Sequence, residues 1–330
     1  MKRRPAGERG AVGAITAAFL AAALGLSAVV VDVGHAWQER RHVITATDAA
    51  ALAAAIDYVE GTDGCATSAG AYVTQNHAAA TMTSCVRTVG SGSTPDRVTV
   101  EAESTIGFFF AQIVGVANTT VDSSTTVNYD HAETVSGGLR PFGLCVDFLA
   151  EIEPPTGPTP DNGIIYRIYY GRTAQATNCN GGDPISGNWG ILDFDGGSNS
   201  NQDIKDWTQD GYTGPPDVAI GDWIEGTPGS FSNSLNSELT HLINNVDHFT
   251  LPIFSEYNDL GGGNAEFLIH NFAEVTLHGF QTTGAQDDRY IDLEFVNGVT
   301  QGGGGGPGGL GAYVIGICAV DGVNEATACS

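Results

Sequence analysis

The densest group of potential metal ligands lies between positions 193 and 203. Its oxygen-bearing side chains are Asp193, Asp195, Asn199, Asn201 and Asp203. Carboxylate and amide oxygens in a glycine-rich loop suit a hard cation, so calcium is the one cofactor that the sequence suggests. The loop does not follow the EF-hand pattern. The competing interpretation is a solvated acidic turn, because turns also need Asp, Asn and Gly.

A second group, His270, Glu274 and His278, has the spacing of metal ligands on one face of a helix. The apolar residues around it alternate, however, and alternation predicts a strand. Four strand residues span roughly 13 Å, too far for one shared metal. We therefore expect these side chains to form the polar, solvent-facing side of a strand.

Sequence motifs for catalysis are missing. The chain has no G-x-S-x-G, no H-E-x-x-H and no G-x-x-x-x-G-K-[ST], which argues against serine hydrolases, zinc proteases and P-loop enzymes. We expect a protein that is not an enzyme. Two alternatives remain open. A glycan-active enzyme would place two carboxylates about 5–10 Å apart in a deep cleft. A glycan- or calcium-binding module would gather Trp189, Trp207 and Trp223 on one exposed surface.

Six cysteines lie outside the N-terminal region, and none forms a C-x-x-C pair. An even number in a chain that leaves the cytoplasm favours disulfides over zinc or redox sites. Proximity along the chain predicts three pairs: Cys65 with Cys85, Cys145 with Cys179, and Cys318 with Cys329. Cys145 with Cys318 is the main rival.

The N-terminal segment has the features of a membrane anchor. Residues 11–31 carry no charge and, as a helix, would extend roughly 31 Å, enough to cross the hydrocarbon core. The basic residues Lys2, Arg3, Arg4 and Arg9 precede it, which places the N-terminus in the cytoplasm. A cleaved signal peptide is the alternative, but the apolar run is longer than a typical signal core.

The rest of the chain is strongly acidic. Of 38 acidic and 13 basic side chains, only three acidic but six basic ones fall within the first 41 positions. Such a surface repels nucleic acid, so no nucleic-acid partner is expected.

Helical character continues past the span. Ile44, Leu52 and Val59 recur at helical spacing among many alanines. We expect this extension to offer an alanine-rich face to a partner helix, with Asp48 on that face as a contact residue.

Three separated elements in this region resemble the N-terminal region of TadE/TadG-like Flp pilus-assembly proteins of the tight-adherence system. They are Arg9-Gly10-Ala11-Val12, Val31-Asp32-Val33-Gly34, and the run from Ala46 to Ala55. The resemblance implies a pilin-like anchor and a role in building or tethering adhesive pili, with the membrane and other pilus-assembly proteins as partners. Prepilins of this group carry glutamate five residues after the cleavage glycine. Here that position, counted from Gly10, is Ile15, which favours an uncleaved anchor.

The predicted fold class is α+β: a long N-terminal transmembrane helix, a small α+β unit and a β-rich outer domain. The expected domains are residues 1–60, 61–135 and 136–330. Within the middle unit, residues 106–116 are predicted to form a buried core helix, because the run is too short to span a membrane. We expect a non-catalytic, single-pass protein of the cell membrane, with its C-terminal domain outside the cytoplasm.

Overall fold

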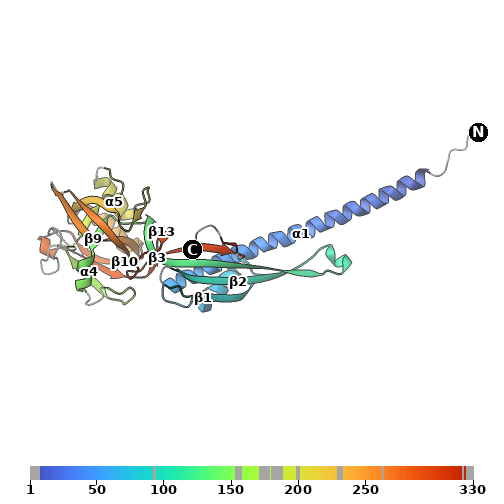
Figure 1. Ribbon diagram of the computed structural model, residues 1–330, viewed down its shortest axis with the longest axis horizontal. Coiled ribbons are helices and arrows are strands. Elements are labelled where there is room, and N and C mark those ends of the chain that lie inside the picture. The colour runs from blue at the N-terminus through green and yellow to red at the C-terminus, as the bar shows by residue number, and fades with distance from the viewer. Residues whose placement is uncertain are drawn as a thin grey trace, which may run out of the picture.

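Figure 1 shows three parts in a row: the free half of a long helix, a sheet beside its other half, and a rounder β-rich body. The computed structural model describes residues 8–91, 94–152, 158–170, 179, 189–197, 201–228, 233–261, 264–321 and 323–324. The arrangement is α+β with a β-rich outer part, as the sequence predicts.

The first helix is much longer than the others. The helices are α1 (Glu8–Val59), α2 (Gly64–Thr67), α3 (Ala69–Asn76), α4 (Val146–Ile152), α5 (Asn201–Asp210) and α6 (Asn236–Asn245), with 3-10 turns η1 (Ala111–Val114), η3 (Asn233–Leu235) and η4 (Gln286–Asp288). At the standard rise, the 52 residues of α1 extend about 78 Å. The chain turns away soon after α1, where Gly61 adopts a positive φ of 80°.

The first sheet packs beside the C-terminal half of α1 and has the central order β1-β2-β3-β14-β12. These strands are β1 (Thr81–Thr88), β2 (Asp96–Gly107), β3 (Asn118–Gly137), β12 (Gly298–Val299) and β14 (Ala312–Val320). Three short strands pair with its inner strands: β7 (Val218–Ala219) and β13 (Gln301–Gly304) with β3, and β15 (Val323–Asn324) with β14.

The second sheet forms the outer body, in the order β5-β11-β10-β8-β6-β4-β9 with an additional pairing of β10 and β9. Its strands are β4 (Phe142–Cys145), β5 (Ile165–Tyr169), β6 (Trp189–Leu192), β8 (Trp223–Pro228), β9 (Phe249–Gly261), β10 (Asn264–Gln281) and β11 (Tyr290–Phe295).

The division at residue 136 does not match the strand pairing. The strand β3 runs through that position to Gly137, and β12 to β15 return from the far end of the chain to the first sheet. The inner unit is therefore assembled from residues 61–137 and from about 298–324. Sequence reading missed this because β14 pairs with β3 across nearly 190 residues.

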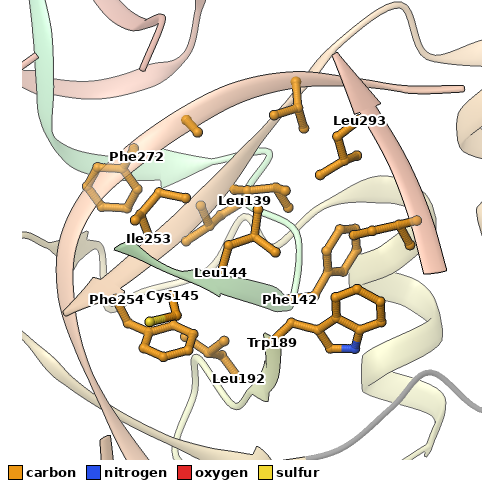
Figure 2. Packing of buried hydrophobic residues seen from close by; sticks show 14 of the residues in the cluster. Leu139, Phe142, Leu144, Cys145, Trp189, Leu192, Ile253, Phe254, Phe272 and Leu293 are labelled. Carbon is orange, nitrogen blue, oxygen red and sulfur yellow. The ribbon is translucent and has the colours of Figure 1, made fainter. Parts of the chain in front are cut away.

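The main core lies in the outer body (Figure 2). Its largest fully buried side chains include Phe142, Trp189, Phe254, Phe267 and Phe272. Close packing there requires glycine at position 190, because a Cβ atom on Gly190 would lie 2.4 Å from Cζ of Phe267. This core holds β4 and β6 against β9 and β10.

The prediction of a buried helix over residues 106–116 is wrong. The strand β2 continues to Gly107, and the segment forms the tip of the β2–β3 hairpin, with only the single turn η1. Its large apolar side chains are exposed: Phe109 by 64% and Ile113 by 84%. The sequence favours a core helix here because the run is too short to span a membrane, and an exposed apolar run costs free energy in water.

Candidate functional site

The two halves of α1 have different surroundings. In its N-terminal half, large apolar side chains such as Leu24 and Val30 are each about 70% exposed. In its C-terminal half, the buried side chains are mostly small; Ala46, Ala50 and Ala54 are fully buried. Here the helix contacts α3, β2 and β3. Small side chains allow this close approach, and α2 comes so near that a Cβ atom on Gly64 would clash with the backbone of Ala54.

The chain itself therefore covers the alanine-rich face that the sequence assigns to a partner helix. Asp48 accepts a hydrogen bond from the hydroxyl of Thr125 at 2.7 Å. The hydroxyl of Thr47 lies 2.9 Å from that of Thr125 and donates to the carbonyl of Ile44. These contacts dock α1 on β3, so Asp48 serves an intramolecular contact, and its contact with a partner stays untested.

Further polar contacts hold α1 at residues nearer its N-terminus. Glu39 accepts a hydrogen bond from the hydroxyl of Ser104 on β2 at 2.7 Å and lies 2.6 Å from Nε2 of His77. Arg40 pairs with Asp321 at 2.9 Å, and Asp321 also accepts from the backbone N–H of Ser124.

The most N-terminal of these contacts involves Asp32, which is only 4% exposed. Its carboxylate accepts hydrogen bonds from the backbone N–H groups of Phe109, Phe110 and Ala111 at 2.7–3.1 Å in their shortest contacts. Sequence reading assigned no role to Asp32. The sequence does contain one signal for such a contact, because Asp32 is an acid that directly follows an uncharged helical span.

Two of the predicted disulfides are present. Cys65 bonds to Cys85 and thereby ties α2 to β1, and Cys145 bonds to Cys179. Proximity along the chain was sufficient to find both pairs. The third predicted pair includes Cys329, which lies outside the described residues.

The structure describes most of the proposed calcium loop. Asp193 is buried with no hydrogen-bond partner at Oδ1 among the described residues. Burial, together with the neighbouring carboxyl of Asp195, raises the pKa of Asp193 to about 6. Oδ1 of Asp195 accepts from the N–H of Gly197 at 2.9 Å, an Asx turn. Asn201 and Asp203 begin α5, and Asn199 lies outside the described residues. Within the described part of the chain, no three His, Cys, Asp or Glu side chains form a metal-type cluster, and calcium stays a prediction.

The expectation of a solvent-facing side of β10 is wrong for Glu274. This carboxylate is 2% exposed. It lies 2.6 Å from Nδ1 of His248 and 2.8 Å from the hydroxyl of Thr250. Glu274, His248 and Thr250 line a cavity of about 210 Å³. Arg140, which follows the end of β3 in the chain, also lines it. Burial lowers the pKa of Arg140 to about 10.

The three tryptophans near the acidic loop do not share an exposed surface. Trp189 is 1% exposed and belongs to the core, and Trp207 packs against that core, whereas Trp223 is 41% exposed. The arrangement that would favour a glycan-binding platform is therefore not present.

Within the described residues, α1 is the one helix long and apolar enough to cross a membrane. The most apolar 18-residue stretch of this helix is not buried by the rest of the chain. Residues 10–57, nearly the whole helix, match the model of putative Flp pilus-assembly TadE/G-like proteins. No curated protein and no solved structure matches the chain. The helix α1 is thus similar, over almost its whole length, to the segment that this family model describes.

Proposed function

We propose that this chain is a non-catalytic, single-pass surface protein that contributes to Flp/Tad pilus assembly or adhesion. One observation carries the proposal. The family match coincides with α1, which is divided into an apolar half left free by the rest of the chain and a half docked on the first sheet. A helix with one free apolar half and one docked half is suited to join a membrane to the folded outer part.

The proposed orientation places the N-terminus in the cytoplasm. Four basic residues precede the span, whereas only Arg40 and Arg41 follow it closely, so the positive-inside rule favours a C-terminal part that crosses outward. Disulfides such as Cys65–Cys85 favour an oxidising compartment for that part.

The free half of α1 also offers a surface for a second membrane helix. Ala18, Ala22 and Gly25 recur at helical spacing and are exposed. A Cβ atom on Gly25 would meet no atom within 4 Å. Small residues on one face allow two helices to approach closely in a bilayer. The partner that we propose is a transmembrane helix of another pilus-assembly protein.

Photocrosslinking in cells that express the pilus system tests this partner. A photoreactive amino acid at Ala22 should give an adduct with a pilus-assembly protein. The same group at Leu20, on the opposite face of the helix, is the matched control and should react mainly with lipid. Gly25→Leu should abolish the Ala22 adduct without releasing the protein from the membrane. Adducts that contain no pilus-assembly protein would contradict the proposal.

A further inference from the structure

The tip of the β2–β3 hairpin exposes large apolar side chains that the proposed pilus role does not explain. Phe109, Phe110, Ile113 and Val116 are exposed by 64, 44, 84 and 48%. Residues 104–121 contain no ionisable side chain, although the chain as a whole is strongly acidic. This uncharged stretch ends at the same level on both strands, because the flanking Glu103 and Asp122 are cross-strand partners.

The hairpin is fixed along α1 at two levels. Ser104 donates to Glu39, and the backbone N–H groups at the tip donate to Asp32. Glu39 and Asp32 are seven residues apart, about 10 Å along a helix axis. Figure 1 shows the hairpin reaching out beside α1 toward its N-terminal half.

This attachment places the tip where the apolar span ends. Between Arg9 and Asp32 the helix has no charged residue, so Asp32 marks the outer end of the segment that suits the hydrocarbon core. Trp37, which is 62% exposed, follows about 7–8 Å further along the axis. An exposed indole at that distance suits the headgroup region.

The backbone of the tip is also suited to a poorly hydrated environment, where an unpaired N–H or carbonyl is costly. The N–H of Phe108 donates to the carbonyl of Ala117, and that of Val116 to Ala111. The carboxylate of Asp32 satisfies the three N–H groups of residues 109–111. Gly115 closes the turn with a φ of 89°.

From this geometry we propose that residues 107–117 insert into the outer leaflet of the same bilayer that α1 crosses. The lipid surface covers the exposed Phe109, Phe110, Ile113 and Val116. The tip is thus a second membrane contact. With α1 it fixes how the globular part is rotated and tilted relative to the membrane. The inference rests on the proposed anchoring of α1, but not on the role in pili.

Quenching by brominated lipid tests the insertion. The full-length protein is reconstituted into phosphatidylcholine and phosphatidylglycerol vesicles that carry bromine on acyl carbons near the headgroups. In a Trp37→Phe background, Ile113→Trp adds an indole at the tip. The matched control is Val89→Trp. Val89 is 69% exposed and lies between β1 and β2, at the end of β2 that is opposite the tip. We expect brominated lipid to cause a loss of emission from I113W and none from V89W.

Quenching of the native Trp37 distinguishes a failure of the anchoring by α1 from a failure of the insertion of the tip. If Trp37 is quenched but I113W is no more quenched than V89W, the anchor stands and the insertion of the tip is wrong. If neither Trp37 nor I113W is quenched, the anchoring itself fails, and the inference falls with it. A blue-shifted emission from I113W that brominated lipid leaves unchanged would show that protein covers the tip, which also overturns the proposal.

Discussion

The ion pair of His248 and Glu274 makes stability depend on pH. The Glu274 carboxylate, which contacts Nδ1 of His248 at 2.6 Å, raises the pKa of His248 above its ordinary value. A pKa raised by folding gives stability that is fully present below the ordinary pKa of histidine and is lost as the pH rises through the folded-state value. Therefore His248→Gln should lower the urea midpoint at about pH 6 and have a smaller effect at about pH 9.

The charge of Glu274 provides the control for this effect. In a Glu274→Gln background the carboxylate that contributes most to the raised pKa of His248 is gone, so the change in midpoint on adding H248Q should differ less between the two pH values than it does in the wild type. A loss of stability in the H248Q single variant that does not change with pH would show that His248 acts only through packing.

Calcium binding by the Asp193 loop remains a prediction at the residue scale. Two neighbouring carboxyls, one of them buried with a pKa raised to about 6, repel each other when ionised, and a bound cation would relieve that repulsion. Calcium at a hundredfold excess over its Kd should stabilise the fold by about 2.7 kcal/mol. We expect the Tm to rise, and Asp195→Ala to remove the rise. A wild-type Tm that calcium leaves unchanged would reduce the loop to an Asx turn.

At the level of elements, Thr125 is the side chain that joins α1 to β3. It is fully buried and contacts both Thr47 and Asp48. Thr125→Val keeps its shape but leaves both polar partners without that hydroxyl, at a cost of about 1–3 kcal/mol. Calorimetry of the full chain in detergent measures the change in Tm. Thr120→Val is the matched control, because Thr120 is exposed on the same strand, and an equal loss from both variants would contradict the docking role.

Gly190 has a similar role in the contact between β6 and β10. An added Cβ would press on Phe267 at 2.4 Å, and that ring is held by Phe254 and Tyr257 at centroid distances of 4.9 and 5.5 Å. We expect Gly190→Ala to cost about 1–3 kcal/mol through overpacking. In Gly316→Ala the added Cβ would lie 3.5 Å from Oδ1 of Asn128, an ordinary contact distance, so this strand glycine should tolerate the change. A G190A variant as stable as G316A would show that the core can adjust.

At the scale of the whole molecule, the mature protein should retain α1 from its first turn. Cleavage near Trp37 would remove Asp32 and leave the backbone N–H groups of residues 109–111 without their acceptor. N-terminal sequencing of membrane-extracted protein should therefore find a terminus before Ala11. Protein released into the medium with a terminus at Trp37 would show that the apolar run is a signal peptide.

The sequence by itself determined the features that depend on neighbours along the chain. An uncharged run of about 21 residues predicts a span, helical spacing with many alanines extends the helix to Val59, and cysteines close in sequence predict the pairs Cys65–Cys85 and Cys145–Cys179. Alternation also identified β10 as a strand. Each of these inferences uses a local period or a short separation, which a linear chain displays directly.

Only the tertiary structure decided which distant segments meet. The return of β14 to β3, the burial of Glu274 beside His248, and the docking of Thr47 and Asp48 on Thr125 all join residues far apart in sequence. The apolar run 106–116 was misassigned for the same reason. Its composition shows that it is apolar, but its place at the tip of the hairpin depends on the distant Asp32, which holds the tip beside the exposed apolar half of α1.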